Sequence, residues 1–490
     1  MGQRVLLRSH PHSTRLILST LAFAFVFLLA ASVPAGAEKT DHAVAAETLT
    51  YNLNLAWVLF AGFLVMFMQL GFALLETGFT RAKNAVNTMA MSLVIYPLGL
   101  IGFWLTGYGI MMGGIAQWPS LGALGVPHRE LSVRFGHHLF GIAGLCKFGL
   151  IRVSAEPASL AMFLFATVFM SIAATIPTGA MAERWKFSAF MLYGLFMSMF
   201  LYPLYGNWVW GGGWLSQLGV NFGWGHGHVD FGGSSVVNMT GGLTALAGAM
   251  VLGPRIGKFR RDGAIGLLAG HNLPLAMSGT LILAFGWFGL NAGSTLAVSD
   301  SRVALIAVNT MLASAAGSIT ALLYLQQRYR RPDVAMACYG LLGGLVSISG
   351  SGAFVSPAAA VLIGIVAGFL VVGTGLALER RFRIDDPAGA IPVHAVCGLW
   401  GALAVGIFAD GTYGDGWNGV AGPVHGLLSG DVGQFIAQLV GVSVNVIVVF
   451  SLAMAFFVTV ERTIGNRVLA EVEWSGLDSL EMGSEAYPSG

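Results

Sequence analysis

Charged residues are scarce in this sequence of 490 residues, where they make up 10% of the chain. An average soluble domain has about 25% charged residues. The low proportion excludes a soluble globular protein, because most of the surface must then face something other than water. Apolar residues make up 56% of the chain and the mean hydropathy is +0.74, so the composition predicts an integral membrane protein.

Cysteine is also scarce, and Cys146, Cys338 and Cys397 are too few and too scattered for a disulfide framework or a metal site. The net charge of +2, with no basic cluster on one soluble face, gives no indication of a nucleic-acid partner. The sequence has no nucleotide-binding motif, no Cys/His metal spacing and no nucleophile elbow, so it predicts neither an enzyme nor a bound cofactor. His226 and His228 in GWGHGHVD lack a third ligand and are interpreted as loop residues.

The N-terminus has the pattern of a secretory signal peptide. Arg4, Arg8 and Arg15 precede the apolar run LILSTLAFAFVFLLAA, and the small-residue sequence AGA then ends at Ala37. A charged start, a short apolar run and a site of this kind predict cleavage after Ala37. An uncleaved anchor is the alternative, although the apolar run is short for a membrane span.

Eleven apolar stretches follow, each about as long as the 17–25 residues that a helix needs to cross a bilayer. They lie near residues 53–76, 90–114, 158–182, 187–211, 231–253, 273–292, 303–327, 334–350, 356–379, 392–409 and 433–460. Several are rich in glycine and alanine, which allows helices to approach closely in lipid. The sequence therefore predicts an all-α integral membrane protein with eleven transmembrane helices, of which the eighth is short.

The loops between these spans differ in their content of lysine and arginine. With the mature N-terminus outside, the inside segments hold 16 of these residues and the outside segments hold 5. Cytoplasmic loops carry an excess of basic residues, so the N-terminus is predicted to be outside and the C-terminus cytoplasmic. The predicted organisation is a signal peptide at 1–37, an eleven-helix domain at 38–462 and a cytoplasmic tail at 463–490, in the cytoplasmic (inner) cell membrane.

Two stretches of the sequence nearly match. DFGGSSVVNMTGGL begins at Asp230 and DPAGAIPVHAVCGL begins at Asp386. Eight residues after the acid stands a polar side chain, Asn238 or His394, and a Gly-Leu pair follows four and five residues later in both. The stretches belong to the fifth and tenth spans, which cross in opposite directions. They therefore predict an inverted five-plus-five repeat.

A weaker echo of the same repeat lies in the first and sixth spans, as GFALLETG at 71–78 and GWFGLNAG at 286–293. Inverted repeats place a substrate path near the bilayer midplane, at their interface. Asn238 and His394 are therefore expected to face each other across a pore. The alternative for an isolated polar residue is a hydrogen bond between helices, typically worth about 0.6 kcal/mol.

Asp230 stands at the start of the fifth span. A carboxylate within a span costs about 2.5–3.5 kcal/mol and usually marks function. At the start of a helix it also accepts hydrogen bonds from the N–H groups of the first turn. We expect Asp230 to combine capping with function.

Further motifs occur along the whole chain that follows the predicted signal peptide. They are, in order, GFALLETG, KNAVNTM, GAMAERWKFSAF, VWGGGWL, DFGGSSVVN, GHNLP, GWFGLNAGS, DDPAGAIPVHAVCG and, in the tail, WSGLDSLEMGSEAY. Together and in this order they resemble the ammonium transporter family and its Rhesus-type relatives. The resemblance implies homotrimers of eleven-helix protomers in the lipid bilayer, each with its own narrow apolar pore. It implies ammonium or ammonia as the substrate, with methylammonium as a candidate second substrate.

The resemblance also assigns a substrate site. Trp210 and Ser294 would form an outer ammonium site, with Phe165 and Phe169 beside it and Asp230 supporting it electrostatically. A Trp face attracts a cation by about 0.5–2 kcal/mol, and a hydroxyl accepts an N–H bond. Packing within an apolar span is the alternative for each aromatic residue.

The pore lining that the resemblance implies consists of Asn238, His394, Leu290 and Trp287. A bare ammonium-sized ion entering a low-dielectric interior costs on the order of 20 kcal/mol in the idealised limit, which a cation–π contact cannot offset. The family is understood to remove a proton and pass neutral ammonia, with two pore histidines taking part. His394 matches one histidine, but Asn238 replaces the other and does not titrate. Leu290 stands where a gating Phe is common.

Three functions stay open at this point. They are ammonium transport with a changed proton pathway, conduction that also admits ions such as potassium, and ammonium sensing with little or no transport. A sensor often has an added signalling domain, whereas this sequence has only the tail at 463–490, so transport is preferred. A coupled cation transporter would need a carboxylate at the midplane, and the acids are expected at span ends. The family docks a PII-type signal protein at its cytoplasmic face, which makes that protein a candidate partner.

Overall fold

The computed structural model describes residues 39–487, so the predicted signal peptide at 1–37 lies outside the described residues. Residues 39–52 are the first part of helix α2 (Lys39–Phe79). They belong to a separate unit, and the fold below is that of the residues from 53 onward.

The described chain has a helix at each of the eleven predicted spans. Ten helical segments are long and apolar enough to span, and Val334–Ser349 is a shorter apolar helix. The ten are Val44–Phe79, Ala82–Met112, Pro157–Met181, Phe187–Trp210, Ser234–Leu252, Leu273–Thr295, Val303–Tyr329, Pro357–Phe382, Ile391–Phe408 and Val432–Thr463. Each predicted span overlaps one of these helices, and the short one is the eighth. The predicted helical membrane architecture is confirmed, and the strands described below lie outside the predicted spans.

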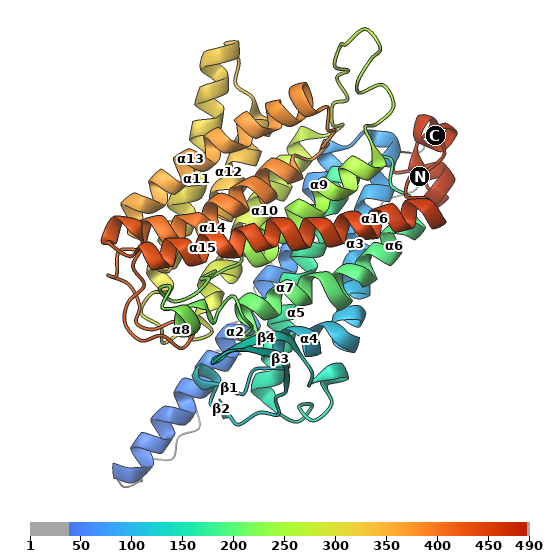
Figure 1. Cartoon of the computed structure of the whole chain (residues 1–490). Coiled ribbons are helices and arrows are strands. Elements are labelled where there is room, and N and C mark those ends of the chain that lie inside the picture. The colour runs from blue at the N-terminus through green and yellow to red at the C-terminus, as the bar shows by residue number, and fades with distance from the viewer. Residues whose placement is uncertain (1–38, 488–490) are drawn as a thin grey trace, which may run out of the picture. The chain divides into compact units, whose positions relative to one another are not determined.

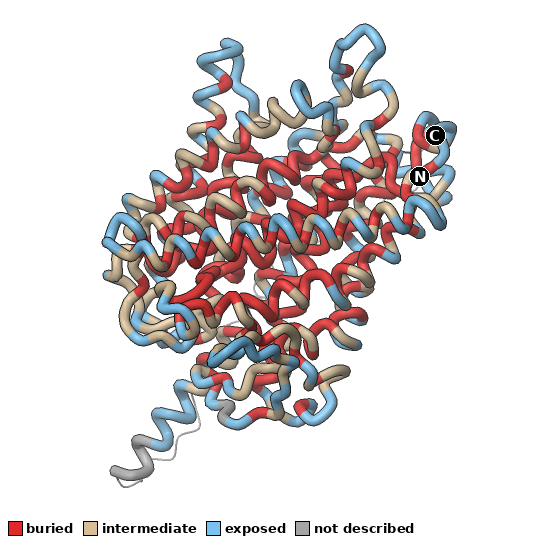
Figure 2. The backbone as a smooth tube through the Cα atoms, in the orientation of Figure 1, coloured by how far each residue is buried: buried red, intermediate tan, exposed pale blue. Residues whose placement is uncertain are grey.

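Several spans are built from more than one helical segment, because π-helical turns interrupt the α-helix. Apart from the short loop helix α8 (Leu218–Phe222), the α- and π-helical segments between α2 and the tail are α3 (Ala85–Gly102), η2 (Phe103–Gly107), α4 (Tyr108–Met112), α5 (Pro157–Met181), α6 (Phe187–Phe196), η5 (Met197–Leu201), α7 (Tyr202–Trp210), η6 (Ser234–Met239), α9 (Thr240–Leu252), α10 (Leu273–Asn291), α11 (Val303–Tyr329), α12 (Val334–Ser349), α13 (Pro357–Ala377), η8 (Leu378–Phe382), η9 (Ile391–Val396), α14 (Cys397–Phe408), α15 (Val432–Val444), η11 (Asn445–Val449) and α16 (Phe450–Thr463). Figure 1 shows α11, α12 and α13 lying side by side, and α15 continuing into α16. Buried residues gather in the interior of the helix bundle, whereas exposed residues lie in the loops and along the outer faces of the helices (Figure 2).

The segment between the second and third spans contains strands that the sequence analysis did not predict. β1 (Gln117–Trp118) pairs with β2 (Ala123–Leu124), and β3 (Glu130–Phe135) pairs antiparallel with β4 (His138–Gly144). The β3–β4 turn contains Gly136 with φ of 61°, a left-handed conformation that favours glycine. These strands are much shorter than the apolar runs that indicate a membrane helix.

The fifth and tenth spans cross where each has its repeated glycine. A Cβ on Gly242 would lie 2.1 Å from the backbone nitrogen of Ala395, and one on Gly398 would lie 2.5 Å from the carbonyl oxygen of Ser234. Each glycine thus lets its own helix touch the π-helical segment of the other span. This reciprocal contact explains why both matching stretches have a glycine at this position.

The first and sixth spans show the same reciprocity. A Cβ on Gly71 would meet the side chain of Leu283 at 2.8 Å, and one on Gly286 would meet Met68 at 2.2 Å. The similar sequences at 71–78 and 286–293 therefore take equivalent places where the first and sixth spans cross, as an inverted repeat requires.

The C-terminal tail folds back onto the beginning of the second span. It forms α17 (Ala470–Ser475) and η12 (Asp478–Met482). The Asp478 carboxylate accepts the N–H groups of Val86 and Asn87 at 2.9 and 2.8 Å. These are first-turn donors of α3 that have no partner within the helix. The tail therefore supplies the N-terminal cap of α3.

Candidate functional site

Asp230 and Asp386 hold the two copies of the repeat in the same conformation. The Asp230 carboxylate accepts the backbone N–H groups of residues 233–236 at 2.8–3.1 Å, and Asp386 accepts those of Ala390 and Ile391 at 3.0 and 2.7 Å. Each acid caps the π-helical segment that carries the polar residue of its copy. The capping predicted for Asp230 is confirmed. Burial raises the pKa of Asp386 to about 6, and its backbone hydrogen bonds partly offset this rise.

Asn238 and His394 are in direct contact at the crossing of the fifth and tenth spans. His394 Nδ1 lies 2.8 Å from Asn238 Oδ1, and both residues are buried. The Asn238 amide nitrogen donates to the Gly233 carbonyl at 2.9 Å, which leaves only the amide oxygen to face the ring. Since that oxygen can only accept, Nδ1 carries the proton and Nε2 of the neutral ring is free to accept one.

A cavity of about 170 Å³, here called the Trp210 cavity, brings together four of the five residues predicted for the substrate site. Trp210, Phe165, Phe169 and Ser294 all line it. The Phe165 and Phe169 ring centroids are 4.6 Å apart, and the Trp210 ring stands edge-on to Phe169 at 5.8 Å. The Ser294 hydroxyl donates to the Leu290 carbonyl at 2.7 Å, so its oxygen can accept a hydrogen bond from a cation.

The Trp210 cavity has further lining residues that the sequence analysis missed. They are Met112, Trp118, Met162, Ala166, Val209, Phe231, Leu296, Trp417 and Asn418. Most are apolar or aromatic and come from loops or span ends. Local sequence gives no signal that these distant positions converge.

A continuous set of contacts links the Trp210 cavity to His394. The Trp210 indole N–H donates to the Asp230 carbonyl at 2.6 Å, and the Asp230 carboxylate accepts the N–H of Gly233 at 3.1 Å. The carbonyl of Gly233 in turn binds Asn238, which binds His394. Gly233 has φ of 97°, and a Cβ there would lie 3.2 Å from the Trp210 ring, so glycine is required. Asp230 is thus the residue that positions the Trp210 ring and Asn238 together.

Two further cavities lie at the start of the tenth span. The Glu76 cavity, of about 10 Å³, is lined by His394, Glu76, Gly389 and other residues. The Asp385 cavity, of about 190 Å³, is lined by Asp385, Asp386, Gly389 and Lys258, among others. Because Gly389 lines both, the two cavities adjoin. His394 therefore joins the contacts of the Trp210 cavity to the lining of the Glu76 cavity.

Leu290 and Trp287, the other residues predicted to line a pore, are both fully buried. The Trp287 indole donates to the Ser349 hydroxyl at 2.9 Å, and the Leu290 carbonyl accepts the hydroxyl of Ser294. Neither side chain lines any of the three cavities described above. Their role in lining a pore stays a prediction.

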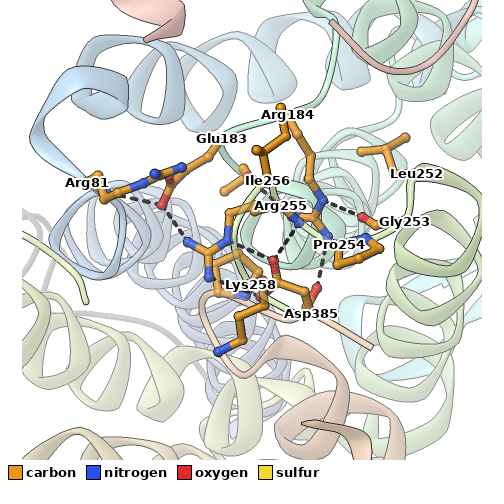
Figure 3. A network of polar contacts seen from close by, with 12 residues as sticks. Arg81, Glu183, Arg184, Leu252, Gly253, Pro254, Arg255, Ile256, Lys258 and Asp385 are labelled. Atoms are coloured by element: carbon orange, nitrogen blue, oxygen red, sulfur yellow. Dashed lines mark hydrogen bonds and ion pairs between the residues drawn. The ribbon is translucent and has the colours of Figure 1, made fainter. Parts of the chain in front are cut away.

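A buried ion network lies on the face that carries the C-terminal tail (Figure 3). Glu183 lies between Arg81 and Arg255, with Arg255 Nη1 at 2.6 Å. Arg255 also binds both Asp385 oxygens at 2.8 and 3.0 Å, and Arg184 donates to the Asp385 carbonyl at 2.8 Å. Burial alone would raise the pKa of Asp385, but Arg184 and Arg255 outweigh it and hold that pKa well below its usual value.

This network was not predicted from the sequence. Glu183 and Asp385 lie within the quoted motifs, but they are 72 and 130 positions from Arg255. Pairing over such distances has no local signal. Among residues 39–487, no group of three or more His, Cys, Asp or Glu side chains is arranged to hold a metal ion.

Known proteins share this architecture and sequence. The chain is 44% identical to ammonium transporter Amt2 of Archaeoglobus fulgidus, covering 96% of this chain and 95% of that protein. It is 32% identical to ammonium transporter 1 member 3 of Solanum lycopersicum, over 90% and 94% of the two chains. A solved structure described as a sensor Amt protein matches with a TM-score of 0.77 and 34% identity, over 88% and 98% of the chains.

A more distant structure shows the fold alone. Candida albicans Mep2 matches with a TM-score of 0.72 and 24% identity, over 86% of this chain and 87% of that one. Residues 56–487 match the sequence profile of the Ammonium Transporter Family. From the helices, the repeat and these matches together, the chain is a multi-span membrane protein that belongs to the Ammonium Transporter Family.

Proposed function

We propose that this protein transports ammonium across the cell membrane through a narrow path within each protomer. The observation that carries the proposal is the Asn238–His394 contact. Asn238 is joined through Gly233 to the Trp210 cavity, and His394 lines the Glu76 cavity. A substrate path that passes this pair would connect the two sides.

The Trp210 cavity has the chemistry of an ammonium site. The Trp210 ring presents a π-face to a cation, and the Ser294 oxygen accepts an N–H bond. These contacts supply a few kcal/mol at most, whereas the bare ion would lose on the order of 20 kcal/mol in a dry interior. The substrate therefore gives up its proton and passes His394 as neutral ammonia. His394 Nε2 is the accepting atom, because Nδ1 is held by Asn238.

The direction and assembly are part of the same proposal. The Trp210 cavity faces the outside and the Asp385 cavity faces the cytoplasm, as the basic loops indicate. The signal peptide at 1–37 is removed, the domain at 38–462 forms homotrimers, and the tail at 463–490 lies in the cytoplasm. A PII-type signal protein is a candidate partner at that face, where the tail and the ion network lie.

The test is ammonium-evoked current in proteoliposomes that contain the purified protein, beside Asn238→His and empty liposomes. We expect a current from the native protein that saturates with ammonium, and none from empty liposomes. Replacing ammonium with potassium tests whether the path also admits other cations. We expect no current with potassium. If only Asn238→His conducts while the native protein still binds ammonium, transport by the native protein is refuted.

Ammonium sensing is the second candidate function, because a structure described as a sensor Amt protein is 34% identical over 88% of this chain. In a sensor, ammonium in the Trp210 cavity would change the position of the C-terminal tail. The same proteoliposome experiment separates the two functions. Binding without current favours the sensor, and saturating current favours the transporter.

A further inference from the structure

Glu76 is a buried carboxylate one helical turn inside the end of its span. It is 2% exposed and lies in α2, which continues to Phe79. The Thr178 and Ser92 hydroxyls donate to its Oε2 at 2.7 and 3.2 Å. A carboxylate in this setting is costly and usually marks a proton or ion pathway. From the sequence, such acids are expected at span ends, and Glu76 is the last residue of the predicted span at 53–76.

The repeat shows that packing alone does not require an acid at this position. Glu76 is the sixth residue of GFALLETG, and Asn291 is the sixth residue of GWFGLNAG in the equivalent span. Asn291 is also buried, and its amide donates to the Thr310 hydroxyl at 3.0 Å. An amide therefore serves one copy of the repeat, whereas the other copy has a group that can bind a proton.

The Glu76 cavity places this carboxylate beside the pore histidine. Of the residues that line the cavity, His394 and Glu76 are the two that titrate. The cavity volume of about 10 Å³ is close to the space that one water molecule needs. Since Asn238 cannot take a proton from His394, the carboxylate is the next acceptor on this side.

We infer that Glu76 is the proton relay that takes the place of the missing second pore histidine. This inference rests on the proposed transport function. An N–H bond of ammonium breaks, its electron pair stays on nitrogen, and the proton joins His394 Nε2. The imidazolium passes one proton to the Glu76 carboxylate, which releases it toward the Asp385 cavity. One ammonia and one proton then cross for each ammonium taken up, which moves one charge.

The test compares charge with substrate in the same proteoliposomes, by recording initial current and the uptake of radiolabelled methylammonium. Glu76→Gln keeps the size of the side chain and an oxygen for Ser92 and Thr178, but it cannot carry a proton. We expect at least a tenfold fall in charge moved per methylammonium, with uptake retained. A purely structural role would lower current and uptake together and leave their ratio unchanged.

Two further variants complete the experiment. Ser92→Ala removes a hydroxyl that holds the carboxylate, and Glu76→Asp keeps the carboxylate on a shorter side chain. Both should keep the native ratio, even where the rate falls. A native ratio in Glu76→Gln overturns the relay while transport stands. A native protein that binds ammonium without any current overturns the transport function, and the relay with it.

Discussion

His394 Nδ1 lies 2.8 Å from Asn238 Oδ1, and the amide nitrogen of Asn238 is already bound to Gly233, so the protonated nitrogen of the ring is determined by its neighbour. We expect ¹⁵N NMR of labelled histidine to show neutral His394 with its proton on Nδ1. In Asn238→Leu the ring loses its acceptor, which costs about 1–3 kcal/mol for a buried donor, and both tautomers should appear. A proton on Nε2 in the native protein would contradict the assignment.

The Trp210 ring should set the apparent affinity for ammonium. Trp210→Leu removes a cation–π contact of about 0.5–2 kcal/mol, which corresponds to a rise of about 2- to 30-fold in the concentration giving half-maximal current. Trp210→Phe keeps an aromatic face but loses the bond to the Asp230 carbonyl, so the rise should be smaller. Trp474→Leu, at an exposed position in α17, is the matched control and should leave this concentration unchanged.

The glycine at the crossing of the two repeats should be essential for stability. In Gly242→Ala the new Cβ would lie 2.1 Å from the Ala395 nitrogen, a backbone atom that cannot move aside. We expect a loss of about 1–3 kcal/mol or more, measured as a lower thermal midpoint in detergent. Gly373→Ala in α13 is the control, because a Cβ there meets nothing within 4 Å. Equal midpoints for the two variants would contradict the close crossing.

The charge of Asp385 should stabilise the face that carries the tail. Its pKa is lowered in the folded protein, so its stabilisation is present above the ordinary value of 3.8 and is lost as the pH falls through the lower folded pKa. Asp385→Asn breaks a buried pair at a cost of about 3–5 kcal/mol, so its thermal midpoint should be lower at pH 7. Below pH 3.8 the variant should lose less stability than the native protein. Asp262→Asn, in an exposed loop, should match the native curve.

The spans and the Asn238–His394 pair could be predicted from the sequence because both leave a signal in short windows. Apolar length marks a membrane helix whatever its neighbours are. The pair was found because the fifth and tenth spans repeat an acid, a polar residue and a glycine at the same spacing. The meaning of that spacing is structural, since the acid caps the π-helical segment and the glycine permits the crossing.

Other features could not be predicted because their partners are distant in the sequence. Arg255 meets Glu183 and Asp385 only when three loops come together. Glu76 is the last residue of the predicted span at 53–76, whereas the helix continues by almost one turn to Phe79. The strands at 130–144 are too short and too exposed to register as apolar segments.

The cap that the tail places on α3 has a consequence for the order of assembly. Residues 86 and 87 leave the ribosome long before Asp478, yet their N–H groups bind its carboxylate. Leu477 N–H likewise donates to Asn84 at 2.9 Å. This face of the protein therefore reaches its final form only after the last membrane helix, α16, has been synthesised. A chain that stops before residue 477 would span the membrane with the first turn of α3 left open.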